Sequence, residues 1–308
     1  MTGDIRVGTA SWTEKTLLES GAFYPPTVRT AEQRLRFYAE RFRVVEVDAT
    51  YYALPSARNA AAWVERTPRD FLFGVKAFAA MTGHPIEPAR LDRDLQAALS
   101  PAMRHARSVA ADVLPSDLHD EIWRRFRANI EPLVAARKLA YVLLQMPPWF
   151  APSTESLDAL ETATSRLPGL QCAVELREAN WLAPEHADET LAWLRARDLT
   201  YVCVDEPQGM RASVSPIAES TTERLAVVRF HGRRIETWTR PGVGTTERFR
   251  YRYAPHELRE WIPRVHALAR QTRTVLALMN NCHRDDAVQS ATDLAALLGD
   301  AQEAKPQA

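Results

Sequence analysis

The strongest constraint on the fold is a series of eight short runs rich in β-branched and other apolar residues, separated by segments with helical periodicity. The runs are expected to be strands at residues 5–10, 44–52, 71–78, 139–146, 170–176, 199–204, 225–231 and 274–279. Strands that alternate with helices form parallel sheets. Eight such units predict an α/β fold, a single (β/α)8 TIM barrel. No glycine-rich phosphate fingerprint follows the first run, which argues against an open nucleotide-binding sheet.

The longest stretch without a strand lies between the third and fourth runs, from residue 79 to 138. Apolar periodicity predicts helices over 91–107 and 118–137, joined by a loop near Leu114-Pro115. A helical elaboration is therefore expected between strands 3 and 4. The barrel is expected to form one domain over residues 1–299, and the small, polar residues 300–308 predict a disordered C-terminal tail.

Charge and composition exclude several classes of protein. The 308 residues include 39 Lys and Arg and 39 Asp and Glu, so no global field favours nucleic acid or a membrane surface. The N-terminus lacks the cationic start and apolar core of a signal peptide, and no apolar run approaches about 18 residues. The three cysteines are odd in number and widely spaced, which argues against a disulfide framework. We expect a cytoplasmic protein with no membrane partner.

Polar residues of one parity interrupt the apolar pattern of most strands. Because the other parity must pack under the helices, the polar parity is expected to face the barrel interior. This rule selects Glu46 and Asp48, Lys76, Gln145, Glu175 and Arg177, Asp205, and Arg229 with His231. All lie late in their strands, where barrels of this kind place their active sites. We call these residues the polar layer, and they predict a binding pocket. The alternative is a structural network in which the buried charges neutralise one another in pairs.

Short motifs along almost the whole chain resemble, in their order and spacing, the DUF72 (YecE-like) family. They are Gly8-Thr9-Ala10-Ser11-Trp12, Phe23-Tyr24-Pro25, Val45-Glu46-Val47 through Tyr51-Tyr52, Trp63 with Thr67-Pro68, Lys76 with Thr82-Gly83-His84, Leu144-Gln145-Met146-Pro147-Pro148, Val174-Glu175-Leu176-Arg177 with Asn180-Trp181, Val228-Arg229-Phe230-His231-Gly232, and Asn280-Asn281. The resemblance implies a TIM barrel of unassigned biochemical role. The family usually shows Glu-Phe-Arg-His where this chain has Glu175-Leu176-Arg177-Glu178, so the chain lacks that imidazole. Suggested kinship with isomerase-like and endonuclease-like barrels is the source of a nucleic-acid hypothesis, which rests on fold analogy.

Three kinds of chemistry fit the polar layer. The first is metal binding, but the sequence has no His-x-His, His-Glu-x-x-His or Cys-x-x-Cys spacing. The cations of the layer would also repel a metal ion. No metal site is therefore predicted. The second is metal-independent acid–base or nucleophilic catalysis on a sugar or carboxylate by a hydrolase or lyase that uses Glu46 and Glu175. The candidate catalytic residues are Glu46, Lys76, Glu175, Asp205 and His231. The cofactor cannot be assigned.

The third kind is recognition of an anion, because arginine, lysine and histidine converge in the layer. The candidate substrate-binding residues are Trp12, His84, Gln145, Arg177, Trp181, Arg229, Asn280 and Asn281. The favoured hypothesis is a phosphate-recognising hydrolase or a nucleic-acid-associated protein, whose partner is an anionic small molecule or nucleic acid. The alternative that the chain is a non-enzymatic binding protein stays open. The oligomeric state cannot be assigned.

Residues 231–253, the arginine-rich segment, contain six arginines with interleaved aromatic residues. Such a pattern is expected of a groove that pairs phosphates and stacks bases. Strand-like alternation would place Phe249, Tyr251 and Tyr253 on one side and the cations on the other. The candidate nucleic-acid contacts are Arg240, Arg248, Arg250 and Arg252. The equally weighted alternative is a solvated segment whose arginines pair with carboxylates.

Overall fold

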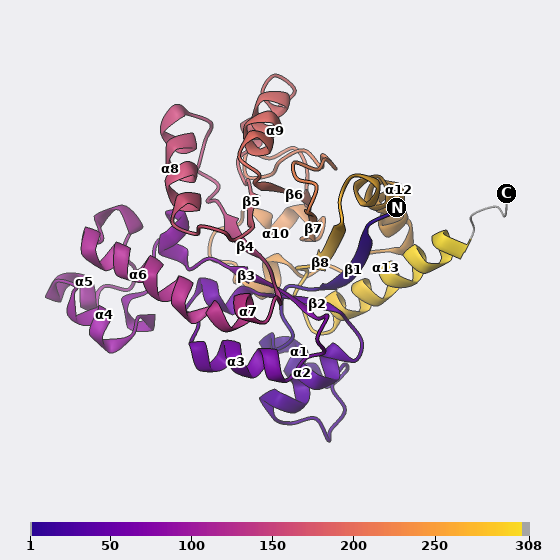
Figure 1. The fold of residues 1–308 in the computed structure, drawn as a ribbon, viewed down its shortest axis with the longest axis horizontal. Coiled ribbons are helices and arrows are strands. Elements are labelled where there is room, and N and C mark those ends of the chain that lie inside the picture. Colours follow the sequence, from indigo (N-terminus) through magenta and orange to yellow (C-terminus); the bar gives the residue numbers. More distant parts are fainter. Residues whose placement is uncertain (1, 304–308) are drawn as a thin grey trace. The chain divides into compact units, whose positions relative to one another are not determined.

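The computed structural model describes residues 2–303, and its eight strands close a parallel barrel in sequence order (Figure 1). The strands are β1 (Asp4–Thr9), β2 (Val44–Val47), β3 (Leu72–Lys76), β4 (Leu139–Gln145), β5 (Cys172–Glu175), β6 (Thr200–Asp205), β7 (Leu225–Phe230) and β8 (Thr274–Met279). The predicted (β/α)8 barrel is confirmed. The contacts of the chain group into two compact units, Met1–Glu46 with Ala179–Ala308, and Val47–Glu178.

Helices separate most of the strands, as the sequence predicts. They are α1 (Lys15–Ser20), α2 (Ala31–Ala39), α3 (Ala57–Glu65), α4 (Arg93–Ala97), α5 (Pro101–His105), α6 (Ser116–Asn129), α7 (Glu131–Ala135), α8 (Thr154–Ser165), α9 (Ala187–Ala196), α10 (Ile235–Trp238), α11 (Thr245–Arg248), α12 (Pro255–Gln271) and α13 (Asp286–Glu303). Helix α13 includes residues 300–303, which the sequence assigned to a tail, and residues 304–308 lie outside the described part of the chain. None of the helices within residues 2–303 combines the length and the apolar character that a bilayer span requires.

In the first unit, β1 pairs with β2 and β8, and β7 pairs with β6 and β8. The close approach of β1 to β2 requires glycine, because a Cβ at Gly8 would lie 2.1 Å from the Val44 carbonyl oxygen. Helix α2 begins at a capping box formed by Thr30 and Gln33. Its buried Tyr38 hydroxyl donates to the Val44 carbonyl (3.0 Å), which fixes the helix against the sheet.

In the second unit, β4 pairs with β3 and β5. The helical elaboration follows β3 and contains α4 to α7, coloured purple to magenta in Figure 1. The predicted helix 91–107 is wrong, because Ser100 caps a new helix with Pro101 at its first position. The predicted helix 118–137 is likewise divided at Ile130, ahead of Pro132. Two long helices were expected, and proline divides each of them.

The run 44–52 is not one strand. Strand β2 ends at Val47, and Asp48–Tyr51 form a 3-10 turn. The Thr50 hydroxyl lies 2.6 Å from the Lys76 carbonyl oxygen and so anchors the turn to β3. Asp48 is therefore placed by a turn, and the parity rule does not apply to it.

The arginine-rich segment contains the short helices α10 and α11, and its described part has no strand. Arg250 and Arg252 are nevertheless exposed, whereas Tyr253 is buried and Tyr251 is half-buried. The predicted strand is wrong, although Arg250 and Arg252 are more exposed than the aromatic residues that alternate with them.

Candidate functional site

Glu46 and Arg229 form a buried ion pair in the first unit. An Arg229 guanidinium N–H donates to Glu46 Oε1 at 2.6 Å, and both side chains are 0% exposed. Because β1 and β8 lie between β2 and β7, this bond must cross the barrel interior. Both side chains therefore point inward, as the alternation of the strands predicts.

His231 and Asn280 lie beside this pair, at the carboxyl ends of β7 and β8. The Asn280 side-chain amide lies 2.9 Å from His231 Nδ1, and the ring of His231 packs near Trp238 and Phe249. The Asn281 side chain binds the backbone of the arginine-rich segment, because its amide donates to the Tyr251 carbonyl (2.8 Å). Asn281 therefore shapes the arginine-rich segment and is not presented to a ligand.

Asp205 faces away from the interior. The register places it beside Phe230, whose ring packs against Trp261 of α12. Asp205 Oδ2 accepts from Trp261 Nε1 (2.6 Å), and Oδ1 accepts from the Tyr253 hydroxyl (2.7 Å). Arg233 donates to both oxygens. The prediction that Asp205 points inward is wrong, and a carboxylate with this many donors is typical of a structural role.

Trp12 and Trp181 are both buried, Trp12 just after β1 and Trp181 in the 3-10 helix Ala179–Leu182. The Trp12 carbonyl accepts from the Tyr24 hydroxyl at 2.5 Å. Their rings belong to the core of the first unit. Trp149 of the second unit is different, because it is 60% exposed.

Lys76 and Asp48 form the centre of a cluster in the second unit. Lys76 Nζ donates to Asp48 Oδ1 at 2.8 Å and lies 4.5 Å from the centroid of the Tyr51 ring. Lys76 is nearly buried, whereas the Asp48 side chain is 23% exposed. The ammonium is thus held between a carboxylate that water reaches and the face of an aromatic ring, an arrangement that stabilises a cation.

His84 belongs to the same cluster, with its ring 5.3 Å from that of Tyr51 and 5.7 Å from that of Trp149. Burial, together with the positive charges of Lys76 and Arg177, lowers the pKa of His84 to about 4, so the imidazole is neutral at pH 7. The Thr82 hydroxyl donates to the Ala79 carbonyl (3.3 Å), which leaves it to accept from Nδ1–H of His84 at 2.9 Å. Nε2 of the ring is then a hydrogen-bond and proton acceptor.

The lowered pKa of His84 makes the stability of the fold depend on pH. Between pH 6.5 and about 4 the unfolded chain binds a proton that the folded chain excludes, so stability falls as pH falls. From pH 7.5 to 5 the native protein is expected to lose about 2 kcal/mol more unfolding free energy than the His84→Gln variant. Urea denaturation of both proteins at the two pH values measures this difference. Equal losses would contradict the assignment.

Glu175 and Arg177 form a second charge pair in this unit, with Arg177 Nε donating to Glu175 Oε1 at 2.5 Å. Glu175 is fully buried and Arg177 is nearly so. Gln145 lies beside Glu175 in the register of β4 and β5 and is half-buried. We define Asp48, Tyr51, Lys76, His84 and Arg177 as the Lys76 cluster.

Asp48 was predicted to lie in the polar layer but was not among the candidate catalytic or substrate-binding residues, and Tyr51 and Thr82 appeared only in the family motifs. Their signal was the position of Asp48 and Tyr51 directly after a polar strand, and the spacing of Thr82 and His84 around a glycine. Gly83 has φ +77°, a left-handed conformation that lets the chain turn between the two side chains.

Most arginines of the arginine-rich segment have carboxylate partners. Arg234 donates to Glu247 (2.7 Å), Arg252 donates to Asp293 (2.9 Å), and Arg250 lies 3.5 Å from Glu247. Arg248 lies 3.5 Å from the Val243 carbonyl, and Arg240 is exposed. These pairs favour the interpretation of the segment as a solvated surface.

Within residues 2–303, no three His, Cys, Asp or Glu side chains are grouped so that they could hold a metal ion. Within the described residues, Cys172, Cys203 and Cys282 form no disulfide. Burial raises the pKa of Cys172 and of Cys203 to about 12, so neither is a thiolate nucleophile near neutral pH.

Known proteins share this fold over nearly its full length. A DUF72 protein from Thermotoga maritima superposes with a TM-score of 0.74 at 28% identity, covering 96% of this chain and 99% of that one. A DUF72 protein from Enterococcus faecalis gives a TM-score of 0.76 at 23% identity, covering 96% and 95% of the two chains. At 23% identity, the likeness to the Enterococcus faecalis protein concerns the fold alone.

Sequence comparison gives the same relatives. UPF0759 protein YunF of Bacillus subtilis is 32% identical over 298 residues, which are 96% of this chain and 94% of YunF. UPF0759 protein YecE of Escherichia coli O157:H7 is 30% identical over 184 residues, 59% of this chain and 56% of YecE. The family model described as "Protein of unknown function DUF72" matches residues 6–308. Because the family model covers residues 6–308 and YunF is 32% identical over 96% of this chain, the chain belongs to the DUF72 family.

Proposed function

We propose that this protein binds a small molecule bearing a phosphate or other anionic group at the Lys76 cluster and acts on it as a hydrolase. The observation that supports this most is the neutral His84, which two cations surround in a nearly buried site. Burial lowers the pKa of His84 most, and the positive charges of Lys76 and Arg177 lower it further. The same two cations are placed to bind an anionic group that comes into contact with them.

His84 has a chemical role in this proposal. Its Nε2 accepts a proton or hydrogen bond from a water molecule or from a ligand hydroxyl. A bound anion cancels part of the charge of Lys76 and Arg177, and this raises the pKa of His84 toward the range in which a general base works. The imidazole thus becomes a better base when the ligand is present.

The test is titration of the native protein with inorganic phosphate by calorimetry at pH 7. Lys76→Met is expected to weaken phosphate binding at least about tenfold, because a charge-assisted contact is lost. The partly exposed Asp48 can be hydrated in this variant, so the fold should persist. The matched control is Lys15→Met, at an 82% exposed side chain of α1, which should bind phosphate as the native protein does. Absence of binding by the native protein, or equal binding by Lys76→Met, contradicts the proposal.

The alternative that Glu46 and Glu175 catalyse reactions of sugars or carboxylates has less support. Both carboxylates are fully buried and accept from an arginine within 2.6 Å. With this burial and these partners, neither carboxylate is exposed to a substrate.

The nucleic-acid alternative relies on Arg240, Arg248, Arg250 and Arg252. Since Arg250 and Arg252 already lie against carboxylates, phosphate contacts would have to displace those partners. A titration with single-stranded DNA at low salt, run beside the phosphate titration, separates the two ideas. Tight binding that weakens steeply with salt would favour nucleic acid.

A further inference from the structure

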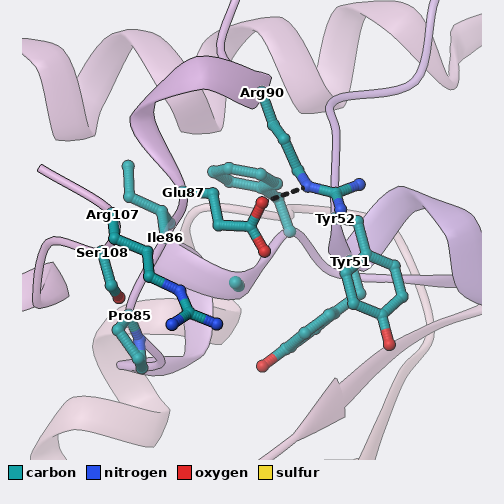
Figure 2. Close-up of a pocket in the computed structure, with 10 residues that line it drawn as sticks. Tyr51, Tyr52, Pro85, Ile86, Glu87, Arg90, Arg107 and Ser108 are labelled. Atoms are coloured by element: carbon teal, nitrogen blue, oxygen red, sulfur yellow. Dashed lines mark hydrogen bonds and ion pairs between the residues drawn. The ribbon is translucent and has the colours of Figure 1, made fainter. Parts of the chain in front are cut away.

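A pocket of about 260 Å³ lies in the second unit, between the turn after β2 and the start of the helical elaboration (Figure 2). Its walls include Tyr51, Tyr52, Phe78, Ile86, Arg90 and Arg107. These residues come from separate segments of the chain, and the parity of the strands selects none of them. The pocket is therefore a feature that the polar layer does not explain.

The floor of the pocket is apolar, and its rim carries Arg90, Arg107 and Glu87. Phe78 and Ile86 are buried, and the rings of Tyr51 and Tyr52 meet edge to face at 5.0 Å. Arg90 donates to Glu87 (2.7 Å) at the rim. Figure 2 shows the guanidinium of Arg107 reaching toward the centre from the side opposite the two tyrosines. Arg107 is exposed and, within the described residues, has no carboxylate within salt-bridge distance, so its charge is available to a ligand.

Tyr51 connects the pocket with the Lys76 cluster. One and the same ring lines the pocket, lies 4.5 Å from Lys76 Nζ, and lies 5.3 Å from the ring of His84. His84 is also followed directly by Pro85, another residue of the pocket wall. A ligand whose anionic group is bound by Lys76 thus has the pocket within reach of the rest of its structure.

We propose that the pocket binds a planar aromatic ring carried by the anionic ligand, so that the ligand class is an aryl or heteroaryl phosphate. Tyrosine and phenylalanine rings favour an aromatic partner, and a guanidinium stacks on the face of such a ring. The volume is below the range of drug-sized sites, which fits one small ring system. The proposal rests on the proposed function for its anionic group and adds the aromatic preference.

The test compares three probes by calorimetry: inorganic phosphate, methyl phosphate and phenyl phosphate. The native protein is expected to bind phenyl phosphate about tenfold more tightly than methyl phosphate. Tyr52→Ala should remove this preference and leave the affinity for methyl phosphate unchanged, because the ring that lies against Lys76 Nζ is that of Tyr51. Arg107→Ala should weaken phenyl phosphate alone, whereas the control Arg93→Ala, in the same elaboration but outside the pocket wall, should change nothing.

The outcomes separate the two proposals. Equal affinities of the native protein for methyl and phenyl phosphate would overturn the aromatic site and leave the anion site standing. A phenyl preference that survives in Tyr52→Ala and Arg107→Ala would also overturn it, because the ring would then bind elsewhere. Failure of all three probes to bind would overturn both proposals.

Discussion

Replacement of Arg229 by methionine is expected to lower the unfolding free energy by about 3–5 kcal/mol. The substitution leaves the Glu46 carboxylate buried at 0% exposure without the guanidinium that neutralises it across the barrel interior. A carboxylate in that position must either stay charged in a medium of low polarity or take up a proton, and both cost free energy. Guanidinium chloride denaturation of the two proteins gives the difference.

Two controls define the origin of this loss. The double variant Glu46→Leu with Arg229→Met should recover most of the stability, because it removes both charges together. Arg36→Ala breaks the pair with Glu32 on the exposed face of α2 and should cost less than about 1 kcal/mol. A loss as small for Arg229→Met as for Arg36→Ala would show that water reaches the Glu46 carboxylate, and would restore it as a candidate catalyst.

The Asp205→Ala variant should be destabilised by about 3 kcal/mol or more, since several donors lose their acceptor at once. Trp261 Nε1 and the Tyr253 hydroxyl are buried, and each would be left without the bond it makes to Asp205. Thermal or urea unfolding measures the effect, and the affinity for phosphate of the folded fraction should be unchanged.

Glu260→Ala is the matched control, because Glu260 binds the same Arg233 from a side chain that is 49% exposed. It should cost less than about 1 kcal/mol. If Asp205→Ala were as stable as this control and had lost phosphate binding, Asp205 would belong to the site and the structural role assigned to it would be wrong.

The sequence predicted the barrel well, because strand and helix periodicity are local and recur eight times. Where the prediction failed, a short polar or proline signal overrode the periodic pattern. Ser100-Pro101 divides a segment that otherwise reads as one helix. The β-branched run from Val44 to Tyr52 contains the Thr50 hydroxyl, whose bond to the Lys76 carbonyl stabilises a turn that strand propensity cannot reveal.

The site was predicted less completely, because parity gives the face of a strand but not the partners of a side chain. Parity placed Glu46 and Arg229 correctly and failed for Asp205, whose strand has apolar residues on both faces. Only the register with β7, which depends on the whole barrel, shows that Asp205 lies beside Phe230. The pocket could not be predicted, since Tyr52 follows the turn after β2, Arg107 belongs to the elaboration, and only the folded chain brings them together.

The pairing of charges also determines how a ligand arrives. Glu46 with Arg229, Asp48 with Lys76, and Glu175 with Arg177 are each nearest neighbours of opposite sign, in a chain of formal net charge +0. The field of such a pair is that of a dipole and fades within a few ångströms of the surface, well inside the ionic atmosphere of about 8 Å at physiological salt. These three pairs therefore do not steer anions toward the polar layer from a distance. A ligand reaches these residues by diffusion, and they discriminate between ligands only when a ligand is in contact with them.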